Sequence, residues 1–432
     1  MKYKTTQPPK NIIISHVYSS DNKGDAALTS VLIQDLKREF PGSAITILKL
    51  DCVKEHAHFE GVLERPGFMH YALGTYRNPL FKLFYTIYLV CATLIWAIWL
   101  RTARIHVYLP PRLREIAQIY ERADLIVPVG GGYIRSRKGL FNRLNVFLLL
   151  HPLLFGYLLG KPTVLYPQSV GPFQNRLEER AVAFVLKRMM LILLREDTSV
   201  ALLARLGVVQ NVERAIDSGF LLQSKRKMDL HKKYNIPARK LIVGVTVRTW
   251  LSGNAQTNYE KAVANALDNT VNEFDVYVIF IPQVTAAKGD DDRIISRRVH
   301  GYMNCKTAAF TLEDEPDHHD IKAIYDGLDV LLGTRFHSVI FSLTSFVPVL
   351  AIEYEHKTSG IMHDLDLEQW VMKIEDVTTA KLTYALQSLL ECRDLYASYL
   401  QDHLPRYIYK AQQTSVVLAE RYYDQTKSIE EV

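Results

Sequence analysis

Gly333-Thr334-Arg335-Phe336-His337-Ser338 follows the apolar run 328–332, which predicts a buried strand, and precedes the apolar run 339–343, which predicts a helix. Arg335 and His337 are therefore expected at the carboxyl end of a strand, beside a helix N-terminus. In open α/β sheets ligands bind at that edge, and a helix N-terminus favours anions. Arginine offers a planar donor fork for phosphate or carboxylate, and histidine exchanges protons near neutral pH. The stretch predicts an anion site; the alternative is a helix cap beside a packed histidine.

The length and composition are those of an ordinary folded protein. The 432 residues suffice for about two or three domains. The net charge of +6 suits anionic substrates or a negatively charged membrane surface, and does not by itself indicate nucleic acid binding. The first ten residues are polar and are not expected to be a signal peptide. The chain has four cysteines, which are far apart and form no CxxC pair: Cys52, Cys91, Cys305 and Cys392. This spacing argues against a zinc site and against a disulfide framework, and it fits a reducing cytoplasm.

The N-terminal half alternates predicted strands and helices. A strand over 11–17, a polar loop, a helix from Asp25 to about Phe40 and a strand over 44–50 give the order of a parallel βαβ unit. Asp25 has two interpretations, a helix cap or a catalytic carboxylate, and Gly24 beside it allows a substrate to approach closely. Further strands are expected over 124–129, 163–166 and 192–194, and a helix over 198–206 that Glu196 and Asp197 begin as cap and first-turn charge.

A glycine turn, Gly130-Gly131-Gly132, follows the strand predicted over 124–129. Three glycines after a strand allow close backbone approach and expose amide donors. The turn is not a GxGxxG motif, so the signal is weak when taken alone. Gly131 and Gly132 are accordingly candidates for substrate binding.

The charged segment 224–240, which contains Pro237, marks a predicted boundary between domains 1–223 and 224–432. The second half then repeats the alternation, with strands expected over 241–247, 276–281, 307–311, 329–332 and 348–352, helices over 259–274, 291–302 and 320–325, and helical stretches over 382–400 and 407–423. Five polar residues follow these strands and are expected to line one wall of a cleft: Arg248, Gln283, Arg335, His337 and Lys357. Asp25 and the glycine turn are expected on the opposite wall.

The most unusual segment is 83–100, which contains no charged residue and is flanked by Lys82, Arg101 and Arg104. A single membrane span would separate the first βαβ unit from its sheet. We therefore expect apolar helices over 81–104 and 140–160, docked side by side, with an interruption at His151-Pro152. They lie in the membrane interface or, as the alternative, in the protein core. Basic residues that could attract anionic lipid are Arg101, Arg104, Arg112, Arg114, Arg135, Arg137, Lys138 and Arg143.

Several motifs together resemble the polysaccharide pyruvyl transferases. Asn22-Lys23-Gly24-Asp25-Ala26-Ala27 is similar to the start of that family's sequence pattern. Five later segments resemble the family's later motifs in the same order: 129–132, 168–172, 194–197, 334–337 and Tyr354-x-x-Lys357. The resemblance implies an α/β fold with two Rossmann-like domains in a glycosyltransferase-B-like arrangement. It also implies phosphoenolpyruvate as donor, a sugar as acceptor and a pyruvate ketal as product, with no cofactor besides the donor co-substrate.

Phosphoenolpyruvate carries a phosphate and a carboxylate, which call for two cationic clamps. Arg248 and Arg335 fit that role, with Lys357 as a further candidate. The resemblance carries Arg335, Phe336 and His337 over to the donor site by position. His337 is expected to neutralise or protonate the phosphate and Asp25 to act as the base, with the reverse assignment open. The remaining candidate substrate contacts are Gln283, Gly131, Gly132 and Asn22.

The apolar segment adds the expectation of an acceptor on a lipid carrier, such as an undecaprenyl-diphosphate-linked sugar. The N-terminal domain would serve this acceptor, the C-terminal domain the donor, and the protein would be cytoplasmic and peripheral at the inner face of the membrane, in capsule or exopolysaccharide synthesis. Two other functions stay open. A nucleotide-sugar glycosyltransferase would respond to nucleotide and not to phosphoenolpyruvate. A non-catalytic scaffold of a polysaccharide assembly complex would tolerate loss of Arg335 and His337. No metal-ligand cluster is visible in the sequence.

Overall fold

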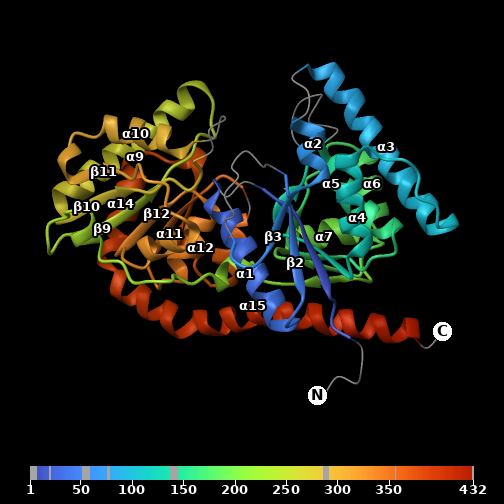
Figure 1. Cartoon of the computed structure of the whole chain (residues 1–432). Coiled ribbons are helices and arrows are strands. Elements are labelled where there is room, and N and C mark those ends of the chain that lie inside the picture. The colour runs from blue at the N-terminus through green and yellow to red at the C-terminus, as the bar shows by residue number, and fades with distance from the viewer. Residues whose placement is uncertain are drawn as a thin grey trace. The chain divides into compact units, whose positions relative to one another are not determined.

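The computed structural model describes residues 7–18, 21–50, 59–74, 78–136, 145–285, 291–355 and 357–430, and its contacts divide the chain into two α/β units (Figure 1). The first unit comprises 1–19, 28–218 and 410–432, and the second comprises 20–27 and 219–409. The main passage, at Ser218/Gly219, lies near the predicted boundary at 223/224. Two segments are exchanged, however, so helices α1 (Lys23–Glu39) and α15 (Arg393–Glu430) each belong partly to both units.

The first unit is built on parallel strands. β1 (Asn11–Val17), β2 (Ala44–Lys49), β3 (Leu63–Pro66) and β4 (Leu125–Pro128) form a sheet in the order β3-β2-β1-β4. β5 (Gly131–Ile134), β6 (Val164–Val170), β7 (Leu191–Leu194) and β8 (Val212–Arg214) form a second sheet in that order, and a parallel bridge between Ile126 and Thr163 links the two. β1 is buried from Ile12 onward, because a parallel sheet is covered on both faces.

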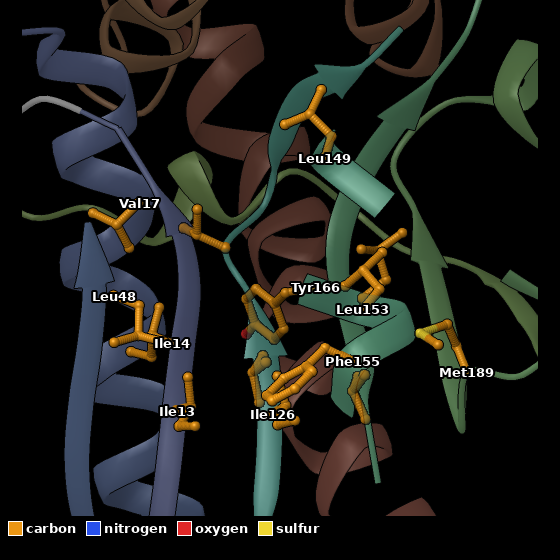
Figure 2. Close-up of a cluster of buried hydrophobic side chains, with 14 of the residues drawn as sticks. Ile13, Ile14, Val17, Leu48, Ile126, Leu149, Leu153, Phe155, Tyr166 and Met189 are labelled. Atoms are coloured by element: carbon orange, nitrogen blue, oxygen red, sulfur yellow. The ribbon is translucent and has the colours of Figure 1, made fainter. Parts of the chain in front are cut away.

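Helices α2 (Phe68–Gly74), α3 (Pro79–Ala103), α4 (Pro111–Arg122), α5 (Asn145–Leu158), α6 (Arg176–Leu186) and α7 (Asp197–Arg205) complete this unit. Figure 2 shows its core, in which Ile126 of β4, Tyr166 of β6 and Phe155 of α5 lie together, each fully buried. The Tyr166 hydroxyl donates a 2.5 Å hydrogen bond to Asp35 of α1, so this buried polar group is satisfied.

The second unit is a single parallel sheet in the order β11-β10-β9-β12-β13-β14. Its strands are β9 (Leu241–Thr246), β10 (Val276–Phe280), β11 (Ala309–Thr311), β12 (Val330–Gly333), β13 (Val349–Glu353) and β14 (Val371–Lys373). Its helices are α8 (Leu230–Lys233), α9 (Gly253–Glu273), α10 (Asp292–Tyr302), α11 (His318–Tyr325), α12 (Phe336–Leu343), α13 (Lys357–Asp364) and α14 (Thr379–Glu391). The chain direction across the sheet reverses between β9 and β12, which is the doubly wound arrangement.

Several sequence-based expectations are corrected. The prediction of a glycine turn is wrong, because Gly131 and Gly132 begin strand β5 and Gly131 pairs with Gln168 of β6. α5 runs through His151-Pro152 without interruption, because burial of this helix outweighs the hydrogen bond that Pro152 cannot donate. The C-terminal helices divide at Cys392, and α15 then continues through Pro405 to Glu430. The prediction also omitted β3, α2, α4 and α6.

α3 is not a fully buried core helix, because one of its faces packs on protein and the other is exposed. Figure 1 shows it beside α2 and α5, at the margin of the first unit. Leu89, Trp96 and Ala97 are buried, and Thr93 Oγ1 lies 2.8 Å from His151 Nε2 of α5, which confirms that the two apolar segments dock together. Among the described residues, α3 alone is long and apolar enough to cross a membrane, and 28% of its most apolar window is buried.

A membrane span is incompatible with the sheet. β1, which precedes α3, and β4, which follows it, pair directly from Ile12–Leu125 to Ser15–Pro128. Strands on opposite sides of a bilayer could not pair in this way. The pairing of β1 with β4 confirms the expectation that a single span over this segment would separate the first βαβ unit from its sheet. Arg137, Lys138 and Arg143, expected to attract lipid, lie outside the described residues.

Two buried histidines tie α5 to its neighbours. His16 Nε2 donates to Leu149 O at 2.8 Å, and its Nδ1 accepts from Ser15 Oγ at 2.9 Å, so the neutral imidazole is fully satisfied. Burial lowers the pKa of His16 from 6.5 to about 4. Burial also lowers the pKa of His151 to about 3, with a smaller effect of the His16 charge. Both side chains are therefore neutral at pH 7.

These two pKa values predict how stability depends on pH. In the unfolded chain both histidines bind protons near pH 6.5, whereas in the folded chain His16 binds one only near pH 4 and His151 near pH 3. Their contribution is fully present above pH 6.5 and is lost as the pH falls from there toward 3, at about 1.4 kcal/mol per unit of pKa difference. We expect the urea midpoint of the first unit to fall over this range.

A His151→Gln variant, which can still bond Thr93 but does not titrate, should show a shallower pH dependence than the wild type. His403→Gln is the control, because His403 is exposed. Equal slopes for wild type and His151→Gln would contradict the prediction.

Candidate functional site

The site lies at the carboxyl edge of the second sheet, where the strand order reverses between β9 and β12. Arg248 follows β9, and Arg335 follows β12 as the N-cap residue of α12. Thr246 of β9 holds the second of these loops: its Oγ1 accepts the amides of Thr334 at 2.9 Å and Arg335 at 3.2 Å. The backbone at Arg335 is therefore fixed by a buried hydroxyl.

Arg335 is itself fixed by a buried carboxylate. Its Nε donates to Asp292 Oδ2 at 3.0 Å and its Nη2 donates to Asp292 Oδ1, so the ion pair is bidentate. Arg335 is 8% exposed and Asp292 3% exposed. Asp292 Oδ2 also accepts the amides of Gln283 and Val284, each at 3.0 Å. One carboxylate thus joins the loops after β10 and β12.

The segment that precedes α1 joins this cluster. The Lys23 amide donates to Gln283 O at 3.0 Å, the Thr285 amide donates to Asp21 O at 3.0 Å, and Asn22 forms an antiparallel bridge with Val284. Segment 20–27 belongs to the second unit. Asp25, which was expected on the wall opposite Arg335, therefore lies with Asn22 in the same unit as Arg335, because this pairing attaches their segment to the loop after β10.

Within the segment, Asn22 orients Asp25. Its Oδ1 accepts the Gly24 amide at 3.1 Å, and its Nδ2 donates to Asp25 Oδ2 at 2.9 Å. Asn22 thus takes the capping position before α1, and Asp25 lies in the first helical turn.

Gly24 brings this segment against His337. A Cβ added at Gly24 would lie 2.5 Å from His337 Cγ and 2.7 Å from its Cε1, and closer still to Nδ1. The imidazole therefore packs directly on the backbone next to Asp25, which only glycine allows. The Phe336 and His337 rings are 5.2 Å apart at 76°. Five predicted site residues are thus gathered in one cluster: Asn22, Asp25, Gln283, Arg335 and His337.

Arg248 forms a second part of the same edge. Its guanidinium carbon lies 4.4 Å from the ring centre of Tyr354 and 5.0 Å from that of Trp250. Its Nε is buried and has no hydrogen-bond partner in the described part of the chain. Lys357, at the start of α13, lies with its Nζ 3.4 Å from Glu355 Oε2. The guanidinium of Arg248 thus packs against two aromatic side chains at the strand end.

Gly131 and Gly132 belong to β5 of the first unit. The neighbouring landmarks there form a buried polar network, in which Arg195 donates to Ser169 Oγ at 2.8 Å and pairs with Asp217. Gln168 is fully buried, and neither of its amide atoms has a partner among the described residues. The Gln283 side chain is 2% exposed, and its Nε2 donates to the Tyr325 hydroxyl at 2.6 Å. The contact of Gln283 with segment 20–27 is made by its backbone carbonyl.

Sequence reasoning missed Asp292, Thr246 and Trp250. An aspartate at a helix start is commonly a cap, so Asp292 carried no signal of its long-range pairing with Arg335. A threonine inside an apolar strand is a possible signal, since its buried hydroxyl must find partners. In the described part of the chain no group of three or more His, Cys, Asp or Glu side chains is arranged to hold a metal ion.

Comparison with known proteins places the chain among its relatives. A family model described as polysaccharide pyruvyl transferase matches residues 22–356, so the match begins at Asn22. The amylovoran biosynthesis protein AmsJ of Erwinia amylovora is 26% identical over 296 residues, which cover 65% of this chain and 69% of AmsJ.

Solved structures share the fold. A glycosyltransferase from Rickettsia africae has a TM-score of 0.55 at 11% identity, with coverage of 97% of this chain and 99% of that one. The UDP-GlcNAc 2-epimerase from Neisseria meningitidis, bound to UDP-GlcNAc, has a TM-score of 0.57 at 8% identity, with coverage of 95% and 98%. At these identities the likeness concerns the fold alone. The predicted class, α/β with two Rossmann-like domains and glycosyltransferase-B-like, is confirmed.

Proposed function

The chain belongs to the polysaccharide pyruvyl transferase family, and from this premise we propose that it transfers pyruvate from phosphoenolpyruvate to a sugar as a ketal. One observation supports the proposal most strongly. A single unit gathers a carboxylate, an imidazole and a fixed guanidinium, from Asp25, His337 and Arg335, at the reversal point of its sheet. These are the groups that a dianionic donor and a hydroxyl acceptor require.

Donor binding is assigned to three cations. Arg335 supplies a guanidinium whose orientation is set by Asp292 before any ligand arrives, which lowers the ordering cost of binding. Arg248 supplies a second, with its buried Nε facing no partner among the described residues. Lys357 adds charge at the neighbouring strand end. Phe336 contributes an apolar wall beside His337. Together they match a phosphate and a carboxylate on one small molecule.

The chemical step balances with the groups present. C3 of the enol accepts a proton, an acceptor hydroxyl attacks C2, and the bond from C2 to the phosphate oxygen breaks. A second hydroxyl then attacks C2 and closes the ketal, so the two hydroxyl protons end on C3 and on the released phosphate. We assign Asp25 as the base toward the acceptor hydroxyl and His337 as the group that neutralises or protonates the phosphate. Asn22 keeps the Asp25 carboxylate in place through the 2.9 Å hydrogen bond.

The acceptor is proposed to be lipid-linked, because α3 presents an apolar face to solvent. From Leu80 to Trp99 every exposed residue of α3 is uncharged. Six large side chains on that face are at least 48% exposed: Leu80, Phe81, Phe84, Ile87, Ile95 and Trp99. An apolar helix that packs on protein along one face and exposes the other suits insertion of the exposed face into one leaflet of a membrane.

Basic residues flank this apolar face. Arg101 donates to Tyr157 O at 2.8 Å, and Arg104, Arg112 and Arg114 are exposed just beyond the end of α3. Such residues are attracted to anionic lipid headgroups, by about 1 kcal/mol each near the surface. The proposal thus places the protein at the inner face of the cytoplasmic membrane, where an undecaprenyl-diphosphate-linked sugar is accessible.

The donor reaction is tested by phosphate release from phosphoenolpyruvate with galactose-, mannose- and N-acetylmannosamine-containing acceptors, free and lipid-linked. We expect release with one acceptor and the mass gain of a ketal. Asp25→Asn should lower kcat by about 100- to 10,000-fold, because the amide keeps an oxygen for Asn22 but cannot accept the proton. Donor affinity, measured by calorimetry, should change little.

Asp376→Asn is the matched control, because Asp376 is an exposed carboxylate in the same unit. Turnover of Asp25→Asn at the wild-type rate would reject the base assignment. Stabilisation by a nucleotide, without any phosphate release, would replace the proposal with a nucleotide-sugar glycosyltransferase.

The membrane proposal is tested by flotation with phosphatidylglycerol-containing vesicles. The wild type should float with the vesicles and the double variant Phe84→Glu/Ile87→Glu should not, because two charges would enter the apolar layer. Leu395→Glu is the control, since Leu395 is 75% exposed on α15, away from α3 in the chain. If the wild type fails to float, or the double variant floats equally well, α3 is not the contact.

A further inference from the structure

Trp250 is an exposed aromatic residue at the edge of the candidate site. It lies in the loop after β9, two residues beyond Arg248, and is 39% exposed. Trp96, by comparison, is 1% exposed in the core of the first unit. Thr249 and Ser252 in the same loop are exposed and polar, and Leu251 between them is half-buried. Trp250 therefore presents part of its indole to solvent.

The loop that presents Trp250 is rigidly held. Gln256 Oε1 accepts the amides of Trp250 at 3.0 Å and Leu251 at 2.9 Å. Gln256 Nε2 donates to Glu260 Oε1 at 2.9 Å, and Arg298 of α10 donates to the same carboxylate oxygen at 2.6 Å. Gln256 and Glu260 are buried. A buried hydrogen-bond network thus fixes the backbone of a residue whose side chain is exposed. A surface residue without a function would not require such a network.

The indole is also fixed on one side by its neighbours. Its ring centre lies 4.8 Å from that of Tyr354, which follows β13, at an interplanar angle of 51°. The Arg248 guanidinium lies over both rings. An aromatic wall therefore stands directly beside the arginine assigned to the donor, with part of the indole left open.

We propose that the open part of the Trp250 indole is the platform on which a pyranose ring of the acceptor lies. One face of a pyranose carries axial C–H groups and is apolar, so it packs on an indole while its hydroxyls stay at the rim. The contact with Arg248 would place those hydroxyls next to the donor. The inference rests on the proposed function, and it names the element of the donor unit that would bind the acceptor.

Saturation-transfer NMR tests this inference without the donor, so its outcome does not depend on turnover. The probes are the methyl glycosides of galactose, mannose and N-acetylmannosamine, added to the full chain. We expect one of them to bind with the strongest saturation on its axial C–H protons, and Trp250→Ala to lose about 90% of that signal. Trp250→Phe should retain part of it, because the smaller ring still offers a flat face. Tyr384→Ala, which removes a 74% exposed aromatic residue of α14, is the control.

Kinetics separate the platform from a role through Arg248. Trp250→Ala should raise KM for the acceptor by about tenfold or more, the equivalent of one lost aromatic contact, and leave the dissociation constant of phosphoenolpyruvate nearly unchanged. If donor affinity falls as far as acceptor affinity, Trp250 acts by holding Arg248 and the platform is rejected. Binding of no pyranoside, or equal binding by Trp250→Ala, would also overturn the inference. Absence of phosphate release with intact glycoside binding would instead count against the donor reaction.

Discussion

The buried ion pair between Arg335 and Asp292 is the interaction on which the site depends. Its carboxylate holds the guanidinium and also accepts the amides of Gln283 and Val284. The same loop pairs with segment 20–27 through Gln283 and Lys23, and Asn22 of that segment bonds to Asp25 and to Gly24. Gly24 in turn packs against His337. Removing one partner of such a pair leaves a buried charge and typically costs about 3–5 kcal/mol. Arg335 is thus a structural element as well as a candidate clamp.

Family membership and geometry support each other at different levels. The family match identifies the chain as a polysaccharide pyruvyl transferase, and the structure contains two Rossmann-like domains. The second unit is proposed to hold the anion site, where Asp292 orients Arg335 and Tyr354 packs on Arg248 without a ligand. The first unit contributes α3, whose buried face bonds to α5 through Thr93 and whose outer face is apolar. Chemistry and membrane attachment are therefore assigned to different parts of the chain.

The sequence was sufficient for much of the fold, because strands of parallel sheets read as short apolar runs: β1 was predicted at its observed bounds, and Arg335 was predicted at a strand end beside a helix. It was insufficient where tertiary contacts decide. An all-apolar segment cannot reveal which face of α3 is buried. Pro152 is tolerated because α5 is enclosed by the core. Two further contacts join residues that are far apart in the chain: Asn22 pairs with Val284, and Asp292 with Arg335. No local sequence pattern predicts either contact.

The central claim, that the segment carrying Asp25 and the imidazole of His337 form one site, is tested most directly by the turnover of Gly24→Ala. The added methyl must displace His337, whereas alanine is favourable within a helix, so folding should be preserved. We expect kcat for phosphate release to fall by about 100-fold, the usual effect of a catalytic group misplaced by about 1 Å. Gly301→Ala, where nothing lies within 4 Å of the added methyl, should keep the wild-type rate. Wild-type turnover by Gly24→Ala would contradict the account.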